Sequence, residues 1–144
     1  MNFKENMNAL SAEAKAALPT HRVYLEQDVK QPERNICAIR RMSAQNNGEL
    51  NARYYRDNAV FRFVLYADSG LQAQLDAESL ATRLYHNRKL GTLQLGAISF
   101  SESFETETAG VHAIIGMLAA SEISKTTLAP GTKLAQVNTK GSVN

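Results

Sequence analysis

The chain has 144 residues, which is the length of one ordinary domain with a substantial buried core. Its 16 Lys and Arg residues nearly balance 14 Asp and Glu residues, and a formal net charge of +2 is too small for a dedicated nucleic-acid binder. No apolar run approaches the roughly 20 residues of a membrane helix, and the opening MNFKENMNAL lacks the apolar core of a signal peptide. We therefore expect no membrane contact, at most transient contact with passing DNA, and synthesis in a reducing cytoplasm.

The first part of the chain predicts a helix followed by a strand. Apolar side chains recur at helical spacing from Asn2 to Leu18. Pro19 ends this helix, because the residue before a proline is pushed out of the α region. The segment His21 to Asp28 alternates like a strand, but it is only half apolar, which places it near an edge of the sheet. Val29 to Arg34 is predicted as a loop.

A second strand is predicted from Asn35 to Met42, and it contains the only cysteine, Cys37. A single cysteine forms no internal disulfide and no thiolate cluster, and its apolar neighbours indicate a buried thiol. The polar segment Ser43 to Asp57 contains an Asn-Asn-Gly turn and is the least ordered-looking internal part of the chain. It is either a solvated hairpin excursion or a loop whose tip meets a partner.

The best-defined stretch is a strand that feeds a helix. Side chains alternate between two faces from Ala59 to Ala67, and Asp68 or Ser69 can then cap the helix that follows. Leu71 to Arg88 is predicted as this helix. It packs on the sheet through four apolar residues at the three-and-four spacing, Ala77, Leu80, Ala81 and Leu84.

Charges in this helix are expected to follow its dipole. Asp76 and Glu78 lie early in it, and the basic residues lie late, where a cation complements the free carbonyl groups. His86 is interpreted as part of that final turn. Gly91 is expected to stop the helix.

The C-terminal third predicts two strands and an arm. The alternation of apolar side chains along Thr92 to Phe104 changes from one strand face to the other at Ala97-Ile98, which indicates a bulge or a bend. Val111 to Ala120 is apolar on both faces, so it is either central in the sheet or buried against another subunit. From Ser124 onward the apolar residues follow no sustained period. This part is interpreted as a loose arm, or as an arm that becomes ordered on a partner.

These elements predict an α+β domain. Strands joined by short turns, with a helix crossing over after the third, indicate a single mainly antiparallel sheet of about five strands with two helices packed on one side. We assign residues 1–125 to this domain and residues 126–144 to a C-terminal extended arm.

Residue chemistry gives no catalytic, cofactor-binding or metal site. None of His21, His86 and His112 has a second ligand at the spacing of one helical face, and His112 is interpreted as an interface or core-edge residue. Asp28-Val29-Lys30 has the spacing of metal-dependent nucleases, but a convincing second acidic ligand does not precede it. We therefore expect a protein that is not an enzyme and needs no metal or nucleotide.

One basic and aromatic concentration spans the two predicted middle strands. It consists of Arg40, Arg41, Arg53, Arg56 and Arg62 with Tyr54, Tyr55 and Phe61 interleaved. Such a mixture can hold single-stranded nucleic acid, and whether Arg53 to Arg62 touches DNA stays open. The favoured interpretation is a solvated sheet face on which nearby carboxylates neutralise the arginines, namely Glu26, Asp28, Glu33 and Glu49.

The succession of elements resembles the tail terminator or tail completion proteins of long-tailed bacteriophages. In that family a strand of alternating Val runs through a short Asp/Ser/Gly turn into a helix rich in Ala and Leu, as VFRFVLYADSGLQAQLDAESLATRLY does here. The resemblance covers Thr20 to Ile123. The long Ser43 to Asp57 segment and the C-terminal arm depart from the smaller members.

This resemblance implies a non-enzymatic virion protein without a cofactor. Its subunits would form a homo-oligomeric ring, usually a hexamer, that caps the tail tube and joins tail to head. The implied partners are further copies of the chain, the tail tube protein and the head-tail connector or neck proteins. The implied location is the tail or neck of the virion, with assembly in the host cytoplasm. The alternatives are another neck or head-tail connector protein, a small binding module with no catalytic activity, and a housekeeping enzyme of unknown chemistry.

Overall fold

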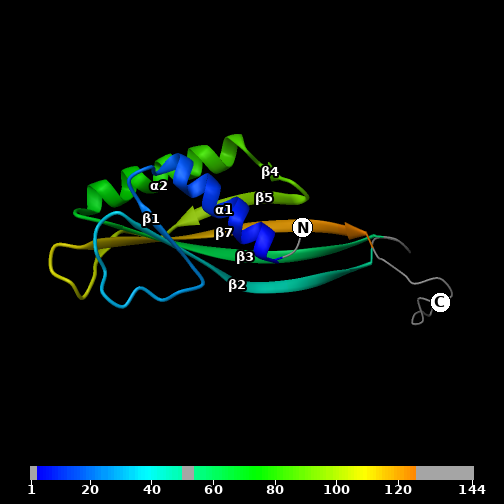
Figure 1. Cartoon of the computed structure of the whole chain (residues 1–144), viewed down its shortest axis with the longest axis horizontal. Helices are drawn as coiled ribbons and strands as arrows, with labels where there is room; N and C mark the ends of the chain where they lie inside the picture. Colours follow the sequence, from blue (N-terminus) through cyan, green and yellow to red (C-terminus); the bar gives the residue numbers. More distant parts are fainter. Residues whose placement is uncertain (1–2, 50–53, 126–144) are drawn as a thin grey trace.

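The computed structural model describes the backbone of residues 3–49 and 54–125 and the side chains of residues 3–42 and 57–122. Two helices lie side by side on one face of a long twisted sheet, and the other face carries no helix in this part of the chain (Figure 1). The elements in chain order are α1 (Phe3–Ala17), β1 (Arg22–Leu25), β2 (Ile36–Glu49), β3 (Tyr54–Ala67), α2 (Gly70–His86), β4 (Lys89–Leu90), β5 (Leu93–Phe100), β6 (Phe104–Glu105) and β7 (His112–Lys125).

The predicted α+β class is confirmed, but the sheet is larger than predicted and is mixed. Within the described residues it has seven strands in the order β1-β2-β3-β7-β5-β4, and β6 pairs with β7 outside this path. All neighbouring pairs are antiparallel except β1 and β2, which are parallel. The prediction that the first strand lies at the edge is confirmed.

The parallel pair arises because the chain between β1 and β2 turns back across the sheet. Both ends of this connection have unusual backbone angles, because Glu26 (φ 56°) and Asn35 (φ 64°) lie in the left-handed region. The Asn35 N–H then donates to the Tyr66 carbonyl, which begins the pairing of β2 with β3. Sequence periodicity reports which face a side chain takes and carries no information on strand direction.

The described parts of the segment Ser43 to Asp57 are strands, so the expectation of a poorly ordered loop is wrong there. Strands β2 and β3 extend into the segment from both sides and pair as far as Glu49 with Tyr55, which agrees with its interpretation as a hairpin excursion. Strand β7 follows β3 to the same end, with Lys125 opposite Tyr54. The ladder hydrogen bonds, rather than apolar alternation, maintain these strands. Figure 1 shows the three strands projecting together past the helices.

The central helix agrees with the prediction at its start and differs at its end. The Ser69 hydroxyl accepts a hydrogen bond from the Gln72 N–H at 3.1 Å, so Ser69 is the N-cap. The helix ends at His86, and the Asn87 N–H donates to the Arg83 carbonyl. The expectation that Gly91 stops the helix is wrong, because Gly91 has φ 63° in the turn between β4 and β5.

The core lies between the helices and the sheet. The predicted apolar stripe of α2 is confirmed, because Leu80 is 0% exposed and Ala77 and Leu84 are also buried; only Ala81 is half-buried. Its partners include Leu10 of α1, Phe63 of β3 and Leu118 of β7. In the described residues, neither helix has both the length and the apolar character needed to cross a membrane.

The doubly apolar strand is central, which was one of its two predicted positions. Strand β7 lies between β3 and β5. The predicted irregularity of β5 is confirmed, because its register with β7 shifts between Leu95 and Ile98. This shift moves Phe100 opposite Gly116, where a side chain on the glycine would meet the ring at 2.5 Å. Gly116 thus leaves the space that the Phe100 ring fills.

Candidate interaction face

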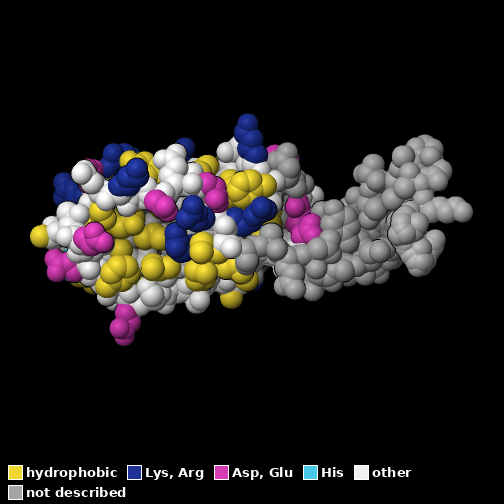
Figure 2. All heavy atoms as spheres, turned by 90° about the horizontal axis from the view of Figure 1, so that it is seen from below, with side chains coloured by type: hydrophobic (Ala, Val, Ile, Leu, Met, Phe, Trp, Pro, Cys, Tyr) yellow, Lys and Arg dark blue, Asp and Glu magenta, His cyan; other side chains and the backbone are white. Residues whose placement is uncertain are grey.

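The sheet face away from the helices is the most unusual surface of the described molecule. We call it the open face and define it by Arg40, Val60, Arg62, Val64, Tyr66, Ile115, Met117 and Ala119, whose strand positions alternate with those of the core residues. Figure 2 shows this side, and hydrophobic side chains spread across it with Lys and Arg among them. The exposed face of an antiparallel sheet is ordinarily polar. An apolar face of this kind is typical of a binding surface.

The strand register arranges the open face in rows. Val64 lies opposite Ile115, and Val60 lies opposite Ala119. Between these two rows, Arg62 lies opposite Met117 on one side and Arg40 on the other. The Met117 side chain is 37% exposed although it belongs to the central strand.

Two segments rise at one end of the open face and enclose a groove of about 330 Å³. One is the connection between β1 and β2, and the other contains β6. The floor includes Val64 and Ile115, and the lining from the β6 segment includes Phe104 and Glu107. The Phe104 ring remains 45% exposed. The groove therefore continues the apolar surface toward this end of the sheet.

The two cross-strand arginines of the open face differ in their partners. Arg40 donates to the Asp28 carboxylate at 3.1 Å and lies 3.8 Å from Glu26. Arg62 is half-buried, and no carboxylate of the described residues lies within ion-pair distance of it. Burial raises the pKa of Tyr66; the Arg62 charge opposes this shift and Asp28 adds to it.

The predicted basic and aromatic concentration is divided by the sheet. Arg40 and Arg62 lie on the open face, whereas Arg41 lies on the helix side, where its guanidinium is 4.2 Å from the Phe3 ring centroid. Phe61 is 1% exposed and belongs to the core. The side chains of residues 53–56 lie outside the described residues. The predicted neutralisation is confirmed for Arg40, which pairs with Glu26 and Asp28, but not for Arg62, and Glu33 pairs with Arg22 instead.

A second feature suited to contact is the outer edge of β2. Strand β1 covers only Ile36–Ile39 of it. From Met42 to Glu49, no strand of the described chain pairs with this edge. A row of backbone N–H and C=O groups without a strand partner is a template for another chain.

The other charged residues singled out in the sequence have structural surroundings. His21 lies against Asp76 in the interior, a contact that the sequence did not indicate because the two residues are far apart in the chain. His112 is half-buried at the start of β7, opposite Glu105. Asp28 forms its ion pair with Arg40. Within the described residues, no group of three or more His, Cys, Asp or Glu side chains gathers closely enough to hold a metal ion.

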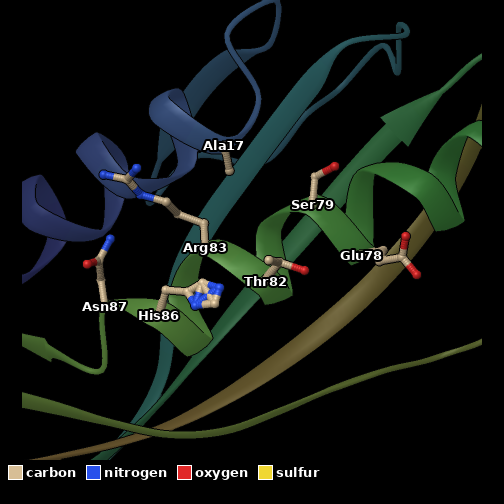
Figure 3. Close-up of a pocket in the computed structure, with 7 residues that line it drawn as sticks. All are labelled: Ala17, Glu78, Ser79, Thr82, Arg83, His86 and Asn87. Atoms are coloured by element: carbon tan, nitrogen blue, oxygen red, sulfur yellow. The ribbon is translucent and has the colours of Figure 1, made fainter.

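The helices border a shallow hollow of about 560 Å³ (Figure 3). Arg83 and Asn87 on this side both donate to the Glu13 carboxylate, at 3.0 and 2.8 Å, and so tie α2 to α1. His86, Thr82 and Ser79 line the remainder. The polar groups that are in contact here thus stabilise the packing of the helices.

Comparison with known proteins places the chain in no family. No protein-family profile matches the sequence, and no curated protein sequence is similar to it. Among solved structures, a chain of the "virion of native gene transfer agent (GTA) particle" is similar at TM-score 0.44 and 12% identity, over 83% of this chain and 94% of that one. The fimbrial biogenesis protein PilO from Pseudomonas aeruginosa is similar at TM-score 0.38 and 8% identity, over 88% and 73%. Similarity at this level assigns neither a fold family nor a function.

Proposed function

We propose that this chain is a structural subunit of a phage-like virion that associates with further copies of itself. The observation that carries the proposal is the open face, where aliphatic side chains and Arg62 lie on the central strands β3 and β7 without a covering layer in the described chain. The β2 edge from Met42 to Glu49 offers a second contact. A closed ring supplies the same partner to every copy and covers such surfaces repeatedly.

The finer proposal follows the family resemblance of the sequence. The ring is a tail terminator, most simply a hexamer, that caps the tail tube, joins the tail to the head-tail connector or neck proteins, and resides in the tail or neck of the virion. Assembly takes place in the host cytoplasm. It acts without catalysis or a cofactor, and its contact with passing DNA is at most transient. The alternatives are another neck protein and a monomeric binding module that uses the open face for one partner.

The oligomeric state tests the proposal. Sedimentation velocity of the full-length protein between 1 and 100 μM is expected to show a concentration-dependent shift from monomer to one defined oligomer, and negative-stain images should show rings. Excess chelator should change neither the sedimentation behaviour nor the rings. A species that remains monomeric throughout this range contradicts self-association and favours the binding module. A defined oligomer without a central opening contradicts the terminator and favours another neck protein.

A further inference from the structure

Arg62 lacks the kind of partner that the other described arginines have. It is half-buried among the aliphatic side chains of the open face, on the central strand β3. A guanidinium that is partly desolvated gains more from a carboxylate than one in open water does. The remaining arginines whose side chains the structure describes contact a carboxylate or an aromatic ring: Arg22 with Glu33, Arg34 with Asp68, Arg40 with Asp28, Arg83 with Glu13, Arg41 with Phe3, and Arg88 with Tyr85.

The segment Glu102–Glu107 carries acidic side chains that lack basic partners, whereas Arg62 is a basic side chain that lacks an acidic one. Glu102, Glu105 and Glu107 are exposed, and none forms an ion pair with a basic side chain of the described residues. Phe104 lies between them and is 45% exposed. Acidic groups around an exposed aromatic ring would match a basic group surrounded by aliphatic side chains.

These two surfaces adjoin on one molecule, because Arg62, Phe104 and Glu107 line the same groove, although no carboxylate of the described residues lies within ion-pair distance of Arg62. Along β7, Arg62 is opposite Met117, whereas Glu105 is opposite His112 at the beginning of the strand. Five residues of strand separate these positions, which is about 17 Å. Glu102 and Glu105 are exposed and do not line this groove, so one copy can present these two carboxylates outward while its own Arg62 remains accessible to another copy from the groove.

We propose that the segment Glu102–Glu107 of one copy docks on the open face of the next copy, with a carboxylate on Arg62 and Phe104 against Met117. The occupant of the open face is thus a second copy of this chain, and the inference rests on the proposed self-association. The contact joins two different surfaces, so it is head-to-tail and propagates until the rotation closes a ring. The contact between Arg62 of one copy and the carboxylate of the other orients the two copies, and the apolar side chains around it provide most of the buried area.

Charge reversal tests this contact in the full-length protein. Arg62→Glu is expected to raise the dissociation constant of the oligomer at least about tenfold, and so is the double variant Glu102→Arg/Glu105→Arg, whose side chains lie outside the groove that contains Arg62. The chain that carries all three reversals should recover most of the loss, because the attraction is restored with opposite signs. The control is Glu78→Arg, which reverses an exposed carboxylate on α2 and should leave assembly unchanged.

The measurement is sedimentation velocity at 50 and 300 mM NaCl, with circular dichroism to verify folding of each variant. Wild-type association should weaken at the higher salt, since the contact is partly electrostatic. If Arg62→Glu fails to fold, the Glu102→Arg/Glu105→Arg variant decides alone, because its side chains are exposed. Normal assembly of these variants overturns the contact while leaving the proposed function intact. A wild-type protein that stays monomeric overturns the proposed function and this contact with it.

Discussion

The Nε2 atom of His21 lies 3.2 Å from the Oδ2 atom of Asp76, and their side chains are 3% and 8% exposed. The pair connects the residue before β1 with the middle of α2. The other carboxylate oxygen of Asp76 accepts a hydrogen bond from the Gln72 side chain at 2.9 Å. Asp76 is therefore part of the interior, whereas the sequence indicated only an acidic charge early in the helix, and the first turn of α2 contains no acidic residue.

Removing one member of this pair should destabilise the fold strongly. His21→Ala leaves the Asp76 carboxylate buried without the side chain that lies against it, and a buried polar group that loses its contact costs about 1 to 3 kcal/mol. The double variant His21→Leu/Asp76→Leu should lose less free energy of unfolding than the sum of the losses in His21→Leu and Asp76→Leu, because neither polar group remains in it. Urea unfolding at pH 7 measures all the variants. Additive losses would show that the two side chains do not interact.

The sequence predicted the elements whose apolar residues repeat regularly. The stripe of Ala77, Leu80 and Leu84 predicted both the position of α2 and the face that it buries. Ser69 was one of two predicted caps and is the observed one. Hydrophobic period and capping chemistry are local properties, so they can be recognised without tertiary structure.

Features that depend on pairing between distant residues could not be predicted. The segment Ser43–Glu49 is polar, and it is a strand because β3 pairs with it. The parallel direction of β1 likewise depends on the backbone turn at Glu26 and Asn35. The open face was partly indicated by the apolar residues on both sides of Val111 to Ala120, one of whose predicted explanations was contact with another subunit. Which of Arg40 and Arg62 has a carboxylate partner could be seen only in three dimensions.

A charge placed under α2 should disrupt the core, and the same change on the outer side of the helix should not. Leu80 is 0% exposed and Leu71 is 69% exposed. Leu80→Asp buries an unpaired carboxylate and is expected to cost on the order of 4 kcal/mol or more, whereas Leu71→Asp should stay within about 0.5 kcal/mol of the wild type. Thermal unfolding compares the two variants. A Leu80→Asp protein that melts like Leu71→Asp would be inconsistent with the packing of α2.

Acid should remove a contribution that Glu122 makes to stability. Burial raises the pKa of this carboxyl, but hydrogen bonds that include those from Thr92 and Asn6 prevail and hold the pKa below its ordinary value of 4.5. A lowered folded-state pKa means that the contribution is complete above pH 4.5 and is lost as pH falls through the folded value. The free energy of unfolding, measured with denaturant, should therefore fall more steeply with decreasing pH in the wild type than in Glu122→Gln. The exposed control Glu78→Gln should follow the wild type, and equal slopes in all three proteins would refute the assignment.

The Cys37 thiol should be chemically silent in the folded protein. It is 0% exposed, and burial raises its pKa to about 12. The thiolate is the reactive form, so alkylation at pH 8 requires opening of the core. Iodoacetamide labelling followed by mass spectrometry should show modification only in denaturant. Rapid labelling of the native protein would place Cys37 outside the core.

Deletion of residues 126–144 should separate folding from assembly. This segment lies outside the described residues, among which the buried core cluster extends from Met7 to Ala120. Its sequence has scattered apolar residues, Leu128, Leu134 and Val137, so we expect it to gain order only on another surface, at roughly 1 to 2 kcal/mol per residue fixed.

The shortened chain should melt at the wild-type temperature, because every residue of that cluster remains. Its self-association, or its docking on the tail tube, should weaken. A matched full-length variant, Leu134→Asp, changes one apolar residue of the segment and should weaken association in the same direction. A shortened chain that unfolds would assign the segment to the core. A shortened chain that forms the wild-type oligomer and still docks on the tube would restrict the contacts to the open face and the β2 edge, whose residues the deletion leaves in place.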